Sequence, residues 1–238
     1  MKIRIKKQNK KVIKEAAKNI QDIPEGQYVE VVENDYIIEV TLKGPYTMKG
    51  KVKGSVTAYK VEPGECVGTV YRISNSRADA GWGPILYDLV LELATRRGAS
   101  VASDRKLVSS DAWNVWNYYL KNRSDVIQGP AVLDVNDETM RYYYGDDPKQ
   151  WPFKQRTDTK SDDCQQYSSM EWATGKGDWY KYSNDERREE VIDNPEKAKN
   201  WHQQPTSKAY IKNNADTLKQ LSSLGILRDE NGNPLEVT

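Results

Sequence analysis

The segment from Ser76 to Ser103, SRADAGWGPILYDLVLELATRRGASVAS, constrains the fold more than any other part of the sequence. Its central part carries an apolar stripe at helical spacing, formed by Ile85, Leu86, Leu89, Val90, Leu93 and Ala94. Gly98 is a typical residue to end that helix, and the apolar run ASVAS after it predicts a buried strand that ends at Asp104. Because Glu65–Ser74 also predicts a strand, the segment indicates a strand–helix–strand unit.

The elements around this unit predict an α+β domain over residues 1–129. A helix is expected over residues 10–21, where apolar residues recur at helical spacing. Strands are expected over Tyr28–Val32, Tyr36–Leu42 and Lys51–Val61, and Asn34-Asp35 is a hairpin signal between the first two. A further helix is expected to begin near Ser110, a plausible N-cap, with Ala112, Val115, Trp116 and Tyr119 on one face.

The character of the sequence changes after Gly129-Pro130. Aliphatic residues are scarce from Ala131 to Pro205, whereas ten aromatic residues lie between Tyr142 and Tyr182. Disorder is one explanation, but so many aromatic side chains favour an irregular extension that packs through tyrosine and tryptophan. We therefore expect residues 130–238 to form an extension ending in a short helix docked on the domain through Leu218, Leu221 and Leu224.

Composition excludes several classes of protein. The formal net charge is +1 and the mean hydropathy is -0.86, with no apolar run long enough to span a membrane. Two distant cysteines, Cys66 and Cys164, and the single His202 argue against a disulfide framework and against a metal site. We expect a cytoplasmic protein. The first 18 residues carry eight Lys or Arg and one Glu, so nucleic acid stays an open partner, although a solvated helix face is the simpler explanation.

The Gly-Trp-Gly turn stands where a helix begins. A helix N-terminus presents unpaired main-chain N–H groups and the positive end of the helix dipole, and glycines there let an anion approach closely. Gly81 and Gly83 occupy this place, Pro84 suits the first helical turn, and Arg77 lies just upstream. A Gly-x-Gly sequence before a helix is also a common tight turn, so an anion site and a purely structural turn both stay open.

The order strand, Gly-x-Gly turn, long helix, short strand and second helix resembles the GNAT acyltransferases over about residues 60–125. The family's turn pattern is Gln/Arg-x-x-Gly-x-Gly/Ala, whereas Arg77 here stands four residues before Gly81. The resemblance implies a GNAT-like mixed, mainly antiparallel sheet flanked by helices, and acetyl-CoA as cofactor. It also implies pantetheine contacts along the strand and pyrophosphate contacts at the turn, by Tyr71, Ile73, Ser74, Arg77, Gly81, Trp82 and Gly83.

The resemblance assigns the catalytic groups less directly. Family members often use a tyrosine on the second helix as the acid, and Trp116 occupies that position here. Tyr118 or Tyr119 would take its place, although Tyr119 on the apolar face also suits the core. Glu65 and Asp104 are the candidate bases nearest the expected cleft, although a surface carboxylate is the simpler explanation for each. Two further candidates for a functional site are weaker. One is a thiol–imidazole pair formed by Cys164 and His202, and the other is a base-stacking group formed by Tyr142–Tyr144.

Two hypotheses follow. The segments VWNYYLKNRSDV and DDCQQYSS are similar to small proteins of tailed bacteriophages. The first hypothesis is an acetyl-CoA-dependent N-acyltransferase of phage type in the host cytoplasm, whose acceptor is a host protein, a small amine or a modified base. The second is a non-catalytic GNAT-like phage protein, structural or virion-associated, that is anchored to other virion or host proteins by the aromatic segment 131–205.

Overall fold

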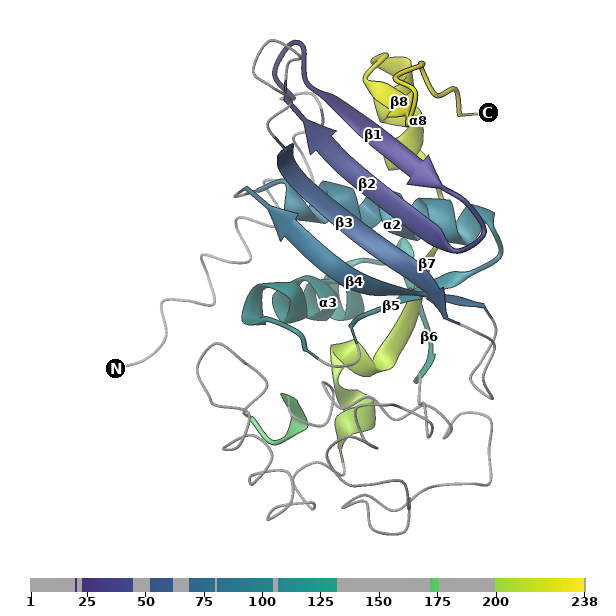
Figure 1. Cartoon of the computed structure of the whole chain (residues 1–238). Helices are drawn as coiled ribbons and strands as arrows, with labels where there is room; N and C mark the ends of the chain where they lie inside the picture. The colour runs from purple at the N-terminus through teal and green to yellow at the C-terminus, as the bar shows by residue number, and fades with distance from the viewer. Residues whose placement is uncertain are drawn as a thin grey trace.

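The computed structural model describes residues 20, 23–44, 52–61, 69–79, 81–104, 107–131, 172–175 and 200–237. These residues form a mixed eight-stranded sheet with three helices, so the predicted α+β class is confirmed (Figure 1). The first part of the chain forms β1 (Tyr28–Glu33), β2 (Ile37–Lys43), β3 (Val52–Val61), β4 (Val70–Ala78), α2 (Gly83–Arg96), β5 (Ser100–Ala102), α3 (Ser110–Asn122) and β6 (Val126–Ala131). The C-terminal part forms the 3-10 turns η4 (Trp201–Gln203) and η5 (Pro205–Ser207), then β7 (Lys208–Lys212), α8 (Asp216–Ser223) and β8 (Leu227–Asp229).

The strand order in the sheet is β6-β7-β5-β4-β3-β2-β1-β8. Strands β1 to β4 form an antiparallel meander, and β4 then runs parallel to β5. The predicted hairpin between β1 and β2 is confirmed. The side chain of Asn34 closes it, because its Oδ1 accepts hydrogen bonds from the amides of Tyr36 and Ile37 at 2.9 and 3.1 Å.

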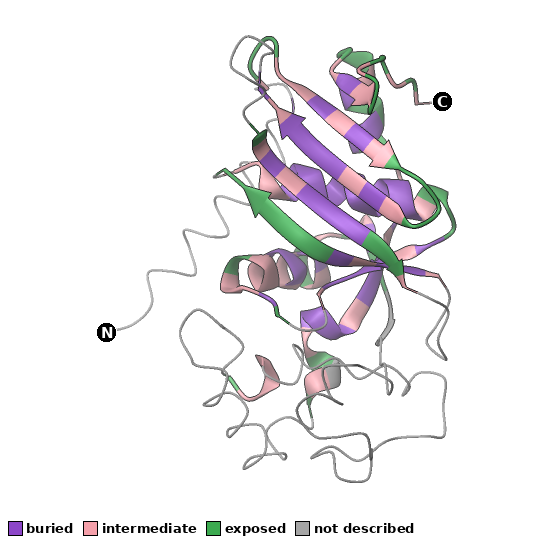
Figure 2. Ribbon diagram, in the orientation of Figure 1, coloured by how far each residue is buried: buried purple, intermediate pink, exposed green. Residues whose placement is uncertain are grey.

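Helices α2 and α3 pack on the same face of the sheet (Figure 2). The predicted stripe of α2 is buried, as is every residue from Pro84 to Ala94. The indole of Trp116 on α3 joins the two helices to the sheet. It stacks on the ring of Tyr210 in β7 at a centroid distance of 5.1 Å and meets Tyr87 of α2 edge-on at 5.5 Å.

The C-terminal part of the chain completes the sheet. Strand β7 lies between β5 and β6, and β8 pairs in parallel with β1 at the opposite edge. The expected docking of the last helix is confirmed for Leu218 and Leu221, which are fully buried, whereas Leu224 is 49% exposed. The α+β domain therefore extends past the expected boundary at residue 129, since β7, α8 and β8 belong to it.

Several expected features lie outside the described residues. These are the helix over residues 10–21, Glu65, both cysteines, the side chain of His202 and the aromatic segment 131–205 apart from Ala131, 172–175 and 200–205. None of the helices in the described ranges is both long and apolar enough to cross a membrane.

Candidate functional site

Strand β4 separates from β5 soon after it begins. Only Val70–Arg72 pairs with β5, at Ser100–Ala102, whereas the pairing with β3 continues to Ala78. Ser74 forms a β-bulge, because Ile73 and Asn75 face consecutive residues of β3. In the described part of the chain, residues 74–78 therefore have a strand on one side only. We call Ser74–Ala78 the open edge of β4, and Figure 2 shows it as a continuous exposed stretch.

The open edge leads directly into the N-terminus of α2. Gly81 has a φ of 93°, a left-handed conformation that favours glycine, and it turns the chain into the helix. The amide of Trp82 donates to the carbonyl of Asp79 at 3.2 Å, and Pro84 has no amide hydrogen. No side chain caps the helix, and within the described residues the amides of Gly83 and Ile85 have no hydrogen-bond acceptor. Two N–H donors at the positive end of the dipole can thus receive an anion.

A tyrosine hydroxyl lies beside the open edge. Tyr87, one turn into α2, has its hydroxyl 3.0 Å from the hydroxyl of Ser76, and only 4% of Tyr87 is exposed. Burial raises the pKa of Tyr87 to about 12. The hydrogen bond with Ser76 lowers the pKa, and the negative charge of Asp104 raises it further. Tyr87 is therefore protonated at neutral pH, and its hydroxyl donates a hydrogen bond to Ser76 Oγ on the open edge.

Tyr119, one of the two predicted acids, lies in the core. Its hydroxyl donates to Asp88 Oδ1 at 2.7 Å, and 1% of the residue is exposed. Burial raises the pKa of Tyr119 well above its ordinary value, and the charge of Asp88 adds to the shift. Arg123 donates a hydrogen bond to each oxygen of Asp88, at 3.2 Å to Oδ1 and 2.9 Å to Oδ2. These contacts favour a structural role for Tyr119. Tyr118 is half-buried, with its ring centroid 6.5 Å from that of Tyr119.

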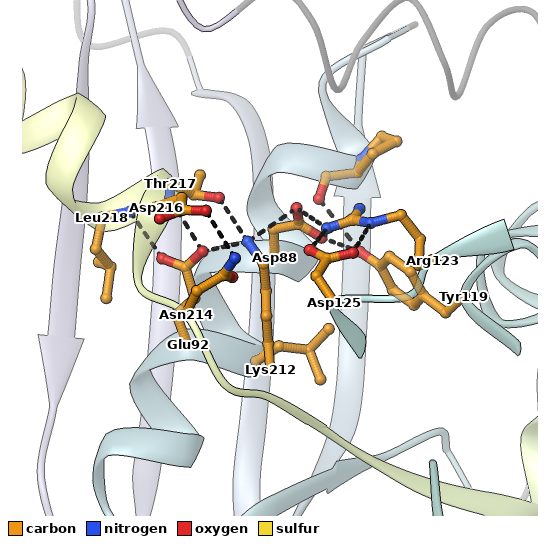
Figure 3. A network of polar contacts seen from close by, with 12 residues as sticks. Asp88, Glu92, Tyr119, Arg123, Asp125, Lys212, Asn214, Asp216, Thr217 and Leu218 are labelled. Carbon is orange, nitrogen blue, oxygen red and sulfur yellow. Dashed lines mark hydrogen bonds and ion pairs between the residues drawn. The ribbon is translucent and has the colours of Figure 1, made fainter. Parts of the chain in front are cut away.

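A second buried polar group connects α2 to the C-terminal part of the chain (Figure 3). The fully buried carboxylate of Glu92 accepts hydrogen bonds from the amides of Thr217 and Leu218, at 3.0 and 2.8 Å, and so caps α8 from a different helix. It also forms an ion pair with Lys212 of β7, whose ammonium lies 3.4 Å from Asp88 Oδ2. Each buried charge has an opposite charge beside it, which is what burial of ionised groups requires. This group positions α8 and β7.

The structure brings together only some of the predicted site residues. Arg77, Gly81, Trp82 and Gly83 lie along or just after the open edge, and Ser74 lies at its start. The main chain of Tyr71 pairs within the β4–β5 ladder, and the side chains of Tyr71 and Ile73 are buried. Asp104 follows β5, where its carboxylate accepts a hydrogen bond from the amide of Leu107 at 2.9 Å.

Tyr87 and its partner Ser76 were not predicted as site residues from the sequence. Tyr87 lies one helical turn after Gly83, and this spacing from the Gly-x-Gly turn is the signal that could have indicated it. In the described part of the chain, no three His, Cys, Asp or Glu residues are grouped closely enough to hold a metal ion.

Comparisons with protein families, with curated proteins and with solved structures gave no match for this chain.

Proposed function

We propose that this protein is an acyl-CoA-dependent N-acyltransferase built on a GNAT-like fold. The observation that carries the proposal is the open edge of β4, which runs into the uncapped N-terminus of α2. An extended chain of amide groups can bond to an unpaired strand edge as a further strand would. A diphosphate is suited to the helix N-terminus that follows. Acyl-CoA combines these two chemistries, with amide groups in its arm and a diphosphate beyond them.

The residues of this chain then take distinct roles. The amides of Gly83 and Ile85 would receive the diphosphate. The unpaired main chain of Ser74–Ala78 would hold the arm. This places the arm further along β4 than the sequence suggested, because Tyr71 is already paired with β5. The proposed site is thus continuous from the β-bulge to the first turn of α2.

The chemistry requires one bond to form and one to break. The amine nitrogen of the acceptor forms a bond to the acyl carbon, the carbon–sulfur bond breaks, and the proton lost by the amine ends on the departing sulfur. The protonated hydroxyl of Tyr87, which donates to Ser76 Oγ, would turn from Ser76 to donate its hydrogen bond to the oxygen or sulfur of the thioester. Tyr87 thus replaces Tyr119 as the proposed donor.

Isothermal titration calorimetry with acetyl-CoA tests the proposal, and Gly81→Ala is the informative variant. Gly81 has a φ of 93° at the turn, and Gly98, with a φ of 68°, has similar strain at the other end of the same helix. Either alanine would cost on the order of 1 kcal/mol in stability. We expect G81A to weaken acetyl-CoA binding about tenfold or more, and G98A to leave it unchanged. Folded wild-type protein that does not bind millimolar acetyl-CoA would refute the proposal and favour a non-catalytic, virion-associated role.

A further inference from the structure

Three polar side chains form a row on one face of β4. Arg72, Asn75 and Arg77 pair with Tyr59, Thr57 and Ser55 of β3, respectively. Those three β3 residues are two positions apart, so they share one face of the sheet, and paired residues share a face as well. The bulge at Ser74 accounts for the uneven spacing on β4. We call Arg72, Asn75 and Arg77 the arginine row.

The arginine row faces away from α2. Ser76, which lies between two members of the row, points to the helix side, where its hydroxyl meets that of Tyr87 at 3.0 Å. Gly54 of β3 and Ala78 of β4 pair with each other and also face the helix side. A Cβ added at Gly54 would lie 2.9 Å from the side chain of Leu86 on α2. Strand side chains alternate between faces, and so Ser76 and the arginine row lie on opposite faces of the sheet at the open edge of β4.

The Nε atom of Arg72 is buried without a hydrogen-bond partner. Among the described residues, no carboxylate forms an ion pair with Arg72 or Arg77. A buried donor without an acceptor is uncommon in folded proteins and needs an explanation. Glu39 of β2 pairs with Thr57 and so lies on the face of the row, two strands from β4, where it accepts a hydrogen bond from the hydroxyl of Thr41 at 3.4 Å. Asp79 forms an ion pair with Lys53 at 3.6 Å. A guanidinium with free donors is the side chain best suited to bind a carboxylate or phosphate.

We propose that the arginine row binds an oxyanion group of the acceptor, so that the substrate is a primary amine that also carries a carboxylate or a phosphate. This inference rests on the proposed function. With the acyl-CoA arm between the Gly81 turn and Tyr87 on the helix side, the acceptor amine reaches the thioester from the arginine side. The row lies opposite five residues of β3, Ser55 to Tyr59, a length of about 13 Å, so its guanidinium groups can hold an oxyanion while the amine lies at the open edge of β4.

The test follows the Nε–Hε signal of Arg72 in ¹H–¹⁵N spectra of the full chain with saturating CoA. Arg72→Lys identifies that signal by removing it. Two matched pairs of amines are titrated: O-phosphoethanolamine against ethanolamine, and β-alanine against β-alaninamide. We expect the signal to move with at least one of the two acidic amines and with neither neutral one. The pair that responds distinguishes a phosphate from a carboxylate.

Two variants distinguish a specific oxyanion site from non-specific attraction to positive charge. Arg77→Gln should weaken binding of the acidic amine about three- to tenfold, as expected for the loss of one charge-assisted contact. Arg96→Gln is the matched control. It removes an exposed arginine at the far end of α2, about 20 Å from the turn, and should change nothing. Equal effects of R77Q and R96Q would overturn the inference.

The inference and the proposed function fail separately. If acetyl-CoA binds but neither acidic amine moves the Arg72 signal, the acceptor class is wrong and the acyltransferase proposal stands. If acetyl-CoA does not bind and the Arg72 signal still responds to the acidic amine, the arginine row is an oxyanion site and the acyltransferase proposal is wrong. If neither ligand produces a response, both are wrong.

Discussion

Replacement of Glu92 by methionine should destabilise the protein strongly, although Glu92 lies far from the proposed site. The Glu92 side chain is fully buried, caps α8 through two amides and pairs with Lys212. Methionine has a similar volume but leaves the buried ammonium of Lys212 with Asp88, at 3.4 Å, and the hydroxyl of Thr217, at 3.0 Å. Removing one partner of a buried ion pair typically costs about 3–5 kcal/mol, and losing a helix cap costs about 0.5–2 kcal/mol in other proteins. We expect a total loss of about 4 kcal/mol, a large part of the ~5–15 kcal/mol that stabilises a typical domain.

Urea denaturation followed by circular dichroism measures this loss. For an m-value near 2.5 kcal/mol/M, the midpoint should fall by roughly 1.5 M. The double variant Glu92→Met with Lys212→Met should recover much of the stability, because no unpaired charge is then left inside. The partly exposed ion pair of Glu30 with Lys43 supplies the control: Glu30→Gln should cost at most about 1 kcal/mol. A loss below about 1 kcal/mol in E92M, or no recovery in the double variant, would show that the reasoning about the buried charge is mistaken.

Two further predictions concern titration and the first hairpin. The pKa of Tyr87 is raised to about 12 in the folded protein. Its contribution to stability is therefore complete below about pH 10 and is lost as the pH rises toward 12. Stability measured between pH 9 and 12 should fall less steeply in Tyr87→Phe, and an unchanged slope would contradict this. Asn34→Ala removes the acceptor for the amides of Tyr36 and Ile37 and should cost about 1 kcal/mol in thermal or urea unfolding, whereas Asn34→Asp keeps the acceptor and should cost less. Equal losses in both variants would argue against the hydrogen bonds as the cause.

The part of the fold that local sequence signals encode was predicted well. The hairpin between β1 and β2, the long helix α2 and the short strand β5 were each expected from periodicity and turn residues, and each is confirmed. The side chain of Ser109 accepts a hydrogen bond from the amide of Ala112. Ser109 is therefore the N-cap of α3, one residue before the expected position. These features were predictable because a turn residue or an apolar spacing acts over only a few residues.

The C-terminal strands could not be predicted in the same way. Strand β7 has the sequence KAYIK, and a lysine at its end gives no local sign of burial. Lys212 is nevertheless buried, because Glu92 lies opposite it after the chain has folded. For the same reason the boundary expected at residue 129 divided strands that pair with one another in a single sheet.

In the candidate site, too, some features follow from local sequence and others only from the tertiary structure. The sequence alone determined that a glycine-containing turn precedes α2, since backbone conformation there depends on the residues of the turn. Only the tertiary structure decided that β4 leaves β5 after Arg72, that Tyr87 and Ser76 meet, and that Tyr119 is bonded to Asp88. Each of these depends on contacts between residues that are distant in sequence, and no local pattern records which partner a buried polar side chain will find.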